Sequence, residues 1–241
     1  MALLSTLRKI LSGKKHFCSA VIAAAGLSQR MDGADKLLLD IQGIPVLGHT
    51  LLAFQVSRYI DEIVIVTRSD LLEQVGEICS RFGITKAAKV IVGGARRLES
   101  VSNGLFAVSG RADLIAVHDG ARPCVEVSLI DTTVEAAARL HAAAPAVRLT
   151  STIKKVRGNE ILETVDREDL VEIQTPQVFK ADLIKAALTK VNKLSVDITD
   201  ECKAVELLGA PVYTTEGSRC NIKITTIEDF KLAQALLGIR N

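Results

Sequence analysis

Short runs of β-branched residues alternate along this chain with longer segments in which apolar residues recur at every third or fourth position. The short runs predict buried strands, and the longer segments predict helices that pack by one face. A strand followed by a helix and another strand favours parallel pairing, because the helix carries the chain back across the sheet. The expected strands are residues 18–25, 62–67, 88–94 and 113–119, and the expected helices are residues 46–57, 70–83, 98–108 and 127–143.

This alternation predicts the fold class, which is α/β: a Rossmann-like, doubly wound, mostly parallel sheet with helices on both faces. The same pattern returns towards the C-terminus after one interruption. Thr225 and Glu228 have the spacing of a helix-capping box there. The expected later helices are residues 180–191, 199–209 and 225–238, and the expected extended segments are residues 211–217 and 221–225.

The interruption covers about residues 147–175. Residues with a preference for strands flank the sequence RGNE, whose Gly-Asn pair suits a tight turn, so the segment is interpreted as a protruding hairpin arm. Because an isolated two-stranded ribbon is marginal in water, we expect the arm to pack on a second copy of the chain and make a homodimer. The simplest organisation is an N-terminal extension, residues 1–16, and one domain, residues 17–241.

Composition narrows the classes of partner. Of the 241 residues, 48% are hydrophobic and 24% are charged, as in ordinary globular proteins. The net charge of +2 and the aromatic content of 3% do not support a nucleic-acid partner, which needs a basic surface or aromatic stacking platforms. No apolar stretch approaches the ~18–20 residues of a membrane span. We therefore expect no nucleic acid and no membrane among the partners.

The five cysteines are scattered and form no C-x-x-C pair. This usage disfavours a disulfide framework or a zinc site and favours a reducing, cytoplasmic location. The N-terminal sequence MALLSTLRKILSGKKHF is basic and lacks the apolar core and cleavage site of a secretory signal. An extra helical turn or a frayed terminus is the favoured interpretation, and a residual targeting segment is the alternative.

Small residues and cations gather where the expected strands end. Ligands of an open parallel sheet bind beyond the carboxyl ends of its strands. The sequences AAAGLSQRM, VGGARRLES, HDGARP and NIK stand at four such ends. Small residues let backbone N–H groups approach a phosphate or a base, and Arg and Lys neutralise phosphate oxygens. Together the four ends predict one site for a small anionic ligand.

Several familiar site patterns are missing from the sequence. Only Gly26 of the first strand end fits the G-x-G-x-x-G frame, which makes a nicotinamide-binding oxidoreductase remote. No G-x-x-x-x-G-K-[ST] sequence occurs, which disfavours a P-loop kinase or ATPase. The residues near HDGARP also show no Ser-His-Asp or Cys-His pattern of nucleophilic catalysis.

Asp119, at the end of the fourth expected strand, has two interpretations. It can be a structural residue that caps a helix or a turn. It can also bind magnesium or a substrate hydroxyl, with Arg122 beside it as a clamp for phosphate or substrate. His118 is more typical of a packing residue at a strand end than of a catalytic base. His49 and His141 stand in apolar helical contexts and are interpreted as structural.

A set of ordered motifs gives the strongest functional signal. The motifs are AVIAAAGLSQRM with the following DK, VGGARRLESV, VHDGARP, TVDR, TPQVF, ITDE and NIKIT, and they cover roughly residues 18–240. In this order they resemble the 2-C-methyl-D-erythritol 4-phosphate cytidylyltransferase family of nucleotidyltransferases. The resemblance implies a transferase of the non-mevalonate isoprenoid pathway that uses CTP and 2-C-methyl-D-erythritol 4-phosphate. Its products would be 4-diphosphocytidyl-2-C-methyl-D-erythritol and pyrophosphate.

The resemblance also implies a role for each motif residue. Arg30 and Lys36 would hold the triphosphate and Lys223 would reach the α-phosphate, which makes these three the catalytic residues. The cofactor would be Mg²⁺, which bridges phosphate oxygens, with Asp119 as its protein ligand. The nucleotide-binding residues would be Ala24, Ala25, Gly26, Gly94, Arg97 and Ser100, and the acceptor-binding residues would be Asp119, Arg122, Thr152, Arg167, Thr175 and Thr199.

In this family the arm builds a homodimer and completes each active site, so Thr152 and Arg167 would come from the neighbouring subunit. Two alternatives stay open. A sibling enzyme, ribitol-5-phosphate cytidylyltransferase, would share the nucleotide motifs and differ in the acceptor pocket, and the TVDR and ITDE motifs count against it. A catalytically silent relative would serve assembly or regulation, and the retained cations and Asp119 count against that.

The chain departs from the family pattern at three places. Gly120 stands where Ala is expected, which is a small-for-small change. Cys220 precedes the NIK motif where a polar residue is expected, which leaves a role there in doubt. The spacer DGADK before Lys36 is slightly short, and this can shift the loop without removing either cation.

Overall fold

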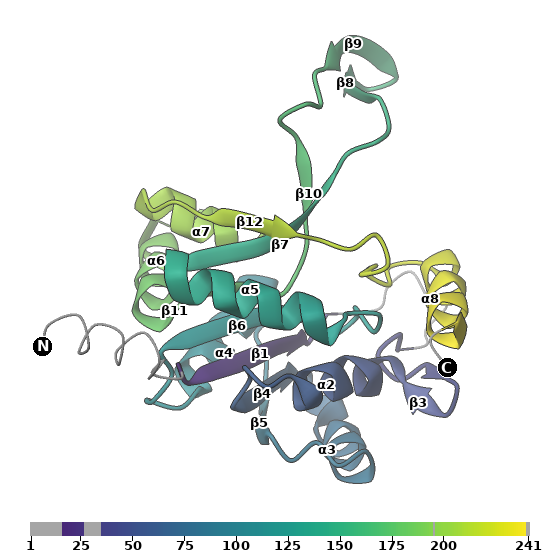
Figure 1. Cartoon of the computed structure of the whole chain (residues 1–241), viewed down its shortest axis with the longest axis vertical. Coiled ribbons are helices and arrows are strands. Elements are labelled where there is room, and N and C mark those ends of the chain that lie inside the picture. The colour runs from purple at the N-terminus through teal and green to yellow at the C-terminus, as the bar shows by residue number, and fades with distance from the viewer. Residues whose placement is uncertain (1–15, 27–34, 195, 240–241) are drawn as a thin grey trace, which may run out of the picture.

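The computed structural model describes residues 16–26, 35–194 and 196–239, and Figure 1 shows their arrangement. Within these residues the main sheet has eight strands in the order β10–β7–β11–β6–β1–β4–β5, with β12 paired to β7. Helices cover both of its faces, so the α/β fold class predicted from the sequence is confirmed. The strands of this sheet are β1 (Cys18–Ala24), β4 (Glu62–Thr67), β5 (Ala87–Val92), β6 (Leu114–Asp119), β7 (Ala142–Arg148), β10 (Val171–Ile173), β11 (Gln177–Lys180) and β12 (Tyr213–Glu216).

The strands β6, β1, β4 and β5 form a parallel group in which each pairs with the next. Ala20 of β1 lies beside Ile63 of β4 on one side and Ala116 of β6 on the other. The first three of these strands are buried along nearly their whole length, as expected for apolar runs covered by helices on both faces. These are the four strands expected from the sequence, and each differs from its predicted range by two residues at most.

The other half of the sheet is mixed. Strand β11 runs antiparallel to both β6 and β7, and β12 runs parallel to β7. Strand β7 corrects one expectation, because the helix predicted over 127–143 ends earlier. Helix α5 (Val127–Leu140) stops before His141, whose φ of 76° is left-handed, and the alanines that follow belong to β7. Alanine favours helices in isolation, and here burial beneath α5 overrides that preference.

Two hydrophobic cores lie on opposite faces of the sheet. Ala20 and Ile22 of β1 point to one core and Val21 points to the other, as the two-residue period of a strand requires. Gly104 allows one helix to lie very close to the sheet, because a Cβ atom there would stand 2.4 Å from Cγ1 of Val21. The helices α2 (Val46–Val56), α3 (Leu72–Arg81, preceded by the short η1, Ser69–Leu71) and α5 cover the first face, and α4 (Arg97–Ala107), α6 (Ala181–Leu194) and α7 (Glu201–Leu208) cover the second.

The arm is a separate two-stranded ribbon, formed by β8 (Ile153–Arg157) and β9 (Glu160–Val165), that projects away from the body of the molecule in Figure 1. Gly158, with a φ of 57°, makes the turn at its tip. The predicted hairpin is thus confirmed at the tip. Its base belongs to the main sheet, because β10 pairs with β7 and places Val171 beside Arg148.

The C-terminal segment corrects two expectations. Residues 221–225 form no strand and run as a loop towards helix α8 (Ile227–Ile239). The capping box of α8 is shifted by one residue from the predicted pair: Thr226 Oγ1 accepts from Asp229 N–H, and the Asp229 carboxylate accepts from the Thr226 backbone N–H. Helix α8 packs near the small ribbon of β2 (Asp40–Ile41) and β3 (Ile44–Pro45), in a third apolar cluster.

None of the helices in the described parts of the chain is long and apolar enough to cross a membrane. The predicted N-terminal extension, residues 1–16, lies outside the described residues except for its last position.

Candidate functional site

A cavity of about 330 Å³ opens beyond the carboxyl ends of β1 and β6. This is the edge of the sheet at which the sequence predicted a ligand site. The cavity brings together nine of the predicted site residues, which are Ala24, Ala25, Gly26, Lys36, Gly94, Arg97, Ser100, Asp119 and Lys223.

Small residues form one wall of the cavity because the backbones of β1 and β6 approach each other there. Ala23 pairs with Asp119 in the register of the two strands, and the Gly120 N–H donates to the Ala23 carbonyl at 2.9 Å. A Cβ atom on Gly120 would lie 3.2 Å from the same carbonyl oxygen, so the position accepts only a small residue. Ala24, the last residue of β1, is almost fully buried.

A second wall comes from the turn that connects β5 to α4. The backbone N–H of Gly94 donates to Ser100 Oγ at 3.1 Å, and that hydroxyl donates to the Arg96 carbonyl at 3.2 Å. A Cβ atom on Gly94 would stand 2.3 Å from Cβ of Glu99, so this turn needs glycine for its close approach to α4. Ser100 therefore shapes the turn from its own buried position as well as lining the cavity.

Asp119 is the electrostatic centre of the cavity. Its carboxylate oxygens lie 3.0 Å from Lys223 Nζ, 3.4 Å from Arg122 Nε and 3.6 Å from Arg97 Nη2. Burial acts to raise the pKa of this carboxyl, but the three cations, led by Lys223, outweigh burial and hold the pKa well below its usual range. Asp119 is thus ionised and orders three positive groups at the floor of the site.

Arg97 is fixed from behind by a residue that the sequence interpretation did not single out. Its Nη1 and Nη2 atoms contact the two carboxylate oxygens of Glu201 at 2.6 and 3.0 Å. Glu201 is fully buried, and Gln177 Oε1 accepts its backbone N–H at 3.1 Å. Burial opposes the charge on Arg97, and the pairing with Glu201 more than offsets this and raises the pKa of the guanidinium. A forked pair of this kind sets the orientation of Arg97 as well as its charge.

Glu201 ends the ITDE motif but was given no role of its own, because an acidic residue in the first turn of a helix already has an explanation. Carboxylates there interact favourably with the helix dipole, and Glu201 is such a residue in α7. Only the packing of α7 against the sheet places this carboxylate in the interior, and the sequence pattern does not specify that packing.

Lys36 reaches the cavity from the loop between β1 and β2. Its Nζ atom donates to the carbonyl of Ile224 at 2.9 Å, and the Ile224 N–H donates to the Ala121 carbonyl at 2.9 Å. These contacts tie Lys36 to the segment that carries Lys223 and to the turn after β6. The two lysines therefore stand at one cavity although the chain between them is long.

Arg122 and Thr175 lie directly behind Asp119 and are buried. Arg122 Nη1 donates to the Asn221 carbonyl at 2.7 Å. The Thr175 hydroxyl accepts from the Asp119 backbone N–H at 3.2 Å, and it lies 3.0 Å from His118 Nδ1. Burial lowers the pKa of His118 to about 3, so its ring is neutral near pH 7. This matches the interpretation of His118 as a packing residue and excludes it as a base near neutral pH.

The other predicted residues that the structure describes do not line this cavity. Thr152 and Arg167 lie on the arm, where they line a separate cavity of about 390 Å³. Thr199 is exposed just before Asp200, which caps α7 by accepting the Lys203 N–H. Arg30 lies outside the described residues.

The described residues contain no group of three or more His, Cys, Asp or Glu side chains that could hold a metal ion. Asp119 is the one carboxylate among the described residues that line the cavity. A divalent ion at this site would therefore take one carboxylate and draw its other ligands from phosphates and water, as Mg²⁺ commonly does at nucleotide sites.

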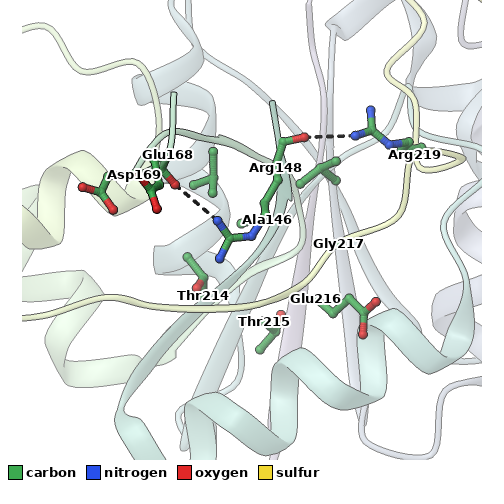
Figure 2. Close-up of a pocket in the computed structure, with 11 residues that line it drawn as sticks. Ala146, Arg148, Glu168, Asp169, Thr214, Thr215, Glu216, Gly217 and Arg219 are labelled. Atoms are coloured by element: carbon green, nitrogen blue, oxygen red, sulfur yellow. Dashed lines mark hydrogen bonds between the residues drawn. The ribbon is translucent and has the colours of Figure 1, made fainter. Parts of the chain in front are cut away.

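A larger cavity, of about 840 Å³, lies at the base of the arm between β7, β10 and β12 (Figure 2). Its two arginines are engaged by backbone: Arg148 Nη1 donates to the Glu168 carbonyl at 3.2 Å, and Arg219 Nη2 donates to the Arg148 carbonyl at 3.0 Å. The lining also carries three carboxylates, and it includes none of the predicted site residues. The smaller cavity is therefore the candidate site.

Comparison with known proteins gives one consistent family. The family model of 2-C-methyl-D-erythritol 4-phosphate cytidylyltransferase matches residues 18–239. The chain is 43% identical over 221 residues to the enzyme of that name from Halalkalibacterium halodurans, an alignment that covers 91% of this chain and 96% of the relative. It is 41% identical over 219 residues to the enzyme of the same name from Dehalococcoides mccartyi, with 90% and 95% covered.

Solved structures agree with this. The 4-diphosphocytidyl-2C-methyl-D-erythritol synthase of Anaerococcus prevotii superposes with a TM-score of 0.83 at 30% identity and covers 93% of this chain and 97% of its own. The 2-C-methyl-D-erythritol 4-phosphate cytidylyltransferase of Thermus thermophilus gives a TM-score of 0.77 at 32% identity, with 91% and 98% covered.

Proposed function

The chain belongs to the 2-C-methyl-D-erythritol 4-phosphate cytidylyltransferase family, and on that premise we propose that it transfers CMP from CTP to 2-C-methyl-D-erythritol 4-phosphate. The products are 4-diphosphocytidyl-2-C-methyl-D-erythritol and pyrophosphate, so the enzyme serves isoprenoid precursor synthesis by the non-mevalonate route. The observation that carries the proposal is the convergence of Lys36, Lys223 and Arg97 on one cavity around Asp119, at the ends of β1 and β6.

This geometry suits the reaction because both substrates are anions. A phosphate oxygen of the acceptor attacks the α-phosphorus of CTP, the new P–O bond forms, and the bond to the bridging oxygen breaks as pyrophosphate leaves. The acceptor oxygen is already an anionic nucleophile, so the reaction needs little help from a general base. It does need two anions held in line and stabilisation of the charge on the leaving group. Lys36, Lys223 and Arg97 are cations placed for those tasks.

We propose that the nucleotide lies against the small-residue wall. Ala24 ends β1 and Ala25 and Gly26 follow it, and the backbone groups of these three residues can read the edge of the cytosine. Gly94 and Ser100 would meet the base and ribose from the opposite wall. Arg97 stands between this wall and Asp119, so it can contact the nucleotide without losing its pair with Glu201.

The acceptor half of the site is proposed to centre on Asp119, which would bind the acceptor hydroxyls. Arg122 and Thr175, buried behind it, complete this part of the site. Thr199 would reach the acceptor from the start of α7. Thr152 and Arg167 would come from the arm of a partner subunit, because within one chain they line a cavity of their own.

A role for Thr152 and Arg167 in the site of a partner subunit requires a homodimer, and the exposed residues of the arm support one. Val156 and Ile161 on the ribbon are 57% and 62% exposed, and a ribbon of two strands gains stability when such residues are covered. We further propose one nucleotidyltransferase domain over residues 17–241 and a cytoplasmic location. The five cysteines are all free thiols, which supports a reducing compartment.

Magnesium would bind at this site mainly through the phosphates of the substrate and only to a small extent through the protein. Asp119 would be its protein ligand, and the triphosphate oxygens would supply most of the rest. When bound, the ion would neutralise charge that develops on the phosphates. The cations of the chain do the same work from the protein side, because Lys36 and Lys223 stand at the same cavity.

The test is pyrophosphate release from each nucleoside triphosphate, with 2-C-methyl-D-erythritol 4-phosphate or ribitol 5-phosphate as acceptor. We expect release with CTP and the methylerythritol substrate. Release only with ribitol 5-phosphate would move the protein to the sibling activity. If no pair of substrates released pyrophosphate, the chain would be a silent relative and the proposal would fail.

A further inference from the structure

Arg68 stands at the end of β4 and joins two carboxylates. Its Nη1 atom lies 2.6 Å from Asp35 Oδ2, while Nε and Nη2 contact the two oxygens of Asp70 at 3.1 and 3.0 Å. The Asp35 pair is the sheltered one, since the side chains of Arg68 and Asp35 are 20% and 11% exposed whereas that of Asp70 is 63% exposed. None of the three is among the described residues that line the cavity.

Asp35 shapes the turn that carries Lys36. Its Oδ1 atom accepts the backbone N–H of Leu37 at 2.9 Å, and its backbone carbonyl accepts the N–H of Leu38 at 3.0 Å. Its other carboxylate oxygen, Oδ2, is the one that meets Arg68. One carboxylate thus links the turn to Arg68 at the end of β4, the strand that pairs with β1. Lys36, the next residue, extends from this turn to the Ile224 carbonyl.

The pairing also removes an electrostatic conflict. Asp35 is an acid directly beside a lysine that is proposed to bind triphosphate, so without a partner it would repel the nucleotide and compete for the ammonium group of Lys36. Arg68 pairs with that carboxylate at its Oδ2 atom, and neither residue lines the cavity. The ion pair is partly sheltered and is therefore less screened than an exposed one.

We infer that Arg68 is a positioning residue for catalysis, which acts through Asp35 to hold Lys36 at the nucleotide phosphates. The inference rests on the proposed cytidylyltransferase activity. Its physical basis is that a catalytic group displaced by about 1 Å can lose up to ~10²-fold in rate, and that the turn before Lys36 is joined to Arg68 through Asp35. Asp70 pairs with the exposed side of Arg68 through Nε and Nη2, whereas Asp35 pairs with Nη1, so Asp70 is the matched control.

The experiment compares steady-state kinetics of the parent, Arg68→Gln, Asp35→Asn, the double variant and Asp70→Asn, with Arg68→Lys as a milder change. We expect Arg68→Gln and Asp35→Asn each to lower kcat by about 10-fold, with the KM for the acceptor within about twofold of the parent. The double variant should lose no more than the worse single variant, because both break one contact. Asp70→Asn should stay within about twofold of the parent, and Arg68→Lys should fall between the parent and Arg68→Gln.

A second comparison asks whether Arg68 works through Lys36. In a Lys36→Ala background, adding Arg68→Gln should change kcat by less than about twofold, since nothing remains to be positioned. A further 10-fold loss in that background would overturn the inference, and so would an Arg68→Gln enzyme with parental kcat. Equal Tm values would show that the variants are folded. If the parent itself released no pyrophosphate, the proposed function would fail first and this inference with it.

Discussion

Asp119 shows how single residues prepare the site before substrate binds. A buried carboxylate draws Lys223, Arg97 and Arg122 to within 3.6 Å and keeps them ordered. Glu201 holds Arg97 from the other side, so the guanidinium has a fixed orientation. Because the protein's own carboxylates order these cations, little reorganisation is needed when the phosphates bind, and such preorganisation is a main source of catalytic stabilisation.

Replacing Lys36 tests whether these cations take part in catalysis. Lys36→Ala removes a charge that is proposed to act on the departing pyrophosphate, so we expect kcat to fall by about 10²–10³-fold, as for single oxyanion-hole donors. The KM for CTP should change much less, because the small-residue wall still binds the nucleoside. Initial rates of pyrophosphate release over a range of CTP concentrations measure both quantities. A variant with near-parental kcat would remove Lys36 from the catalytic residues.

His118 makes a prediction about acid stability. Its folded-state pKa of about 3 lies below the unfolded value of about 6.5, so between these pH values the unfolded chain binds a proton that the native chain does not. The native state should therefore lose stability through His118 as pH falls from 7 to 5, by about 2 kcal/mol at ~1.4 kcal/mol per pH unit. His118→Asn, which keeps an acceptor for Thr175, should lack this loss.

Urea unfolding of the parent and of His118→Asn at several pH values would measure the difference. The window from pH 7 to pH 5 lies above the range in which Asp119 gains a proton, because its lowered pKa confines its own contribution to more acidic solutions. Parallel stability curves for the two proteins over this window would show that His118 titrates normally in the native state.

The residues that sequence reasoning found and missed differ in a physical way. Asp119 ends β6, and Lys36 and Lys223 stand in motif loops that reach the same cavity, at the edge where parallel strands end. Glu201 and Arg68 contribute through ion pairs with partners that are remote in sequence. Which residues form these ion pairs depends on how α7 and the turn at Asp35 pack against the sheet. Neither the hydrophobic period nor the spacing of the residues specifies that packing.

At the scale of elements, the sequence predicted strands correctly where the intrinsic preference of the residues for strands and their burial favour the same structure. The strands β1, β4 and β6 are β-branched and buried, so their ranges were predictable. Strand β7 is rich in alanine, and its position is set by contacts with β11, β12 and β10. The cap of α8 moved by one residue because Asp229 accepts three donors from Thr225 and Thr226, which Glu228 does not.

The arm makes a prediction about shared active sites. If Arg167 acts in the partner's site, mixing Arg167→Ala with Lys36→Ala should restore activity that neither variant has alone. Random reassociation places one intact site in half of the dimers, so roughly a quarter of the parental activity should return. The mixture must be prepared by co-expression or by unfolding and refolding, so that subunits exchange.

A mixture of Lys36→Ala with Lys223→Ala is the matched control, because both residues belong to the cavity of one chain and no exchange creates an intact site. If the first mixture stayed as inactive as this control, the arm would act within its own subunit or have no part in the reaction.

At the scale of the whole molecule, the sheet explains why so much of the function was predictable. Mutually parallel strands bring their carboxyl ends to one edge, so the motifs that follow β1, β5 and β6 meet at one cavity although they are far apart in the chain. The arm departs from this logic, since it leaves the sheet between β7 and β10 and projects from the body. The sequence could indicate the ribbon, but the residues that it contacts depend on a second chain.

The N-terminal boundary of the domain lies near residue 17, and shortened chains should show this. The family model begins at residue 18, and Phe17 already bonds to the residue before β6: its N–H donates to Asp113 Oδ2 at 3.0 Å and its carbonyl accepts the Asp113 N–H at 2.8 Å. A chain that begins at His16 after a new initiator Met should therefore keep kcat within about twofold and Tm within about 2 °C of the full chain. A chain that begins at Ser19 loses both Phe17 contacts and the first residue of β1, and it should unfold at a lower temperature. Thermal unfolding and pyrophosphate release measure both. A loss of activity in the His16 chain would make residues 1–15 part of the working enzyme and move the domain boundary to the N-terminus.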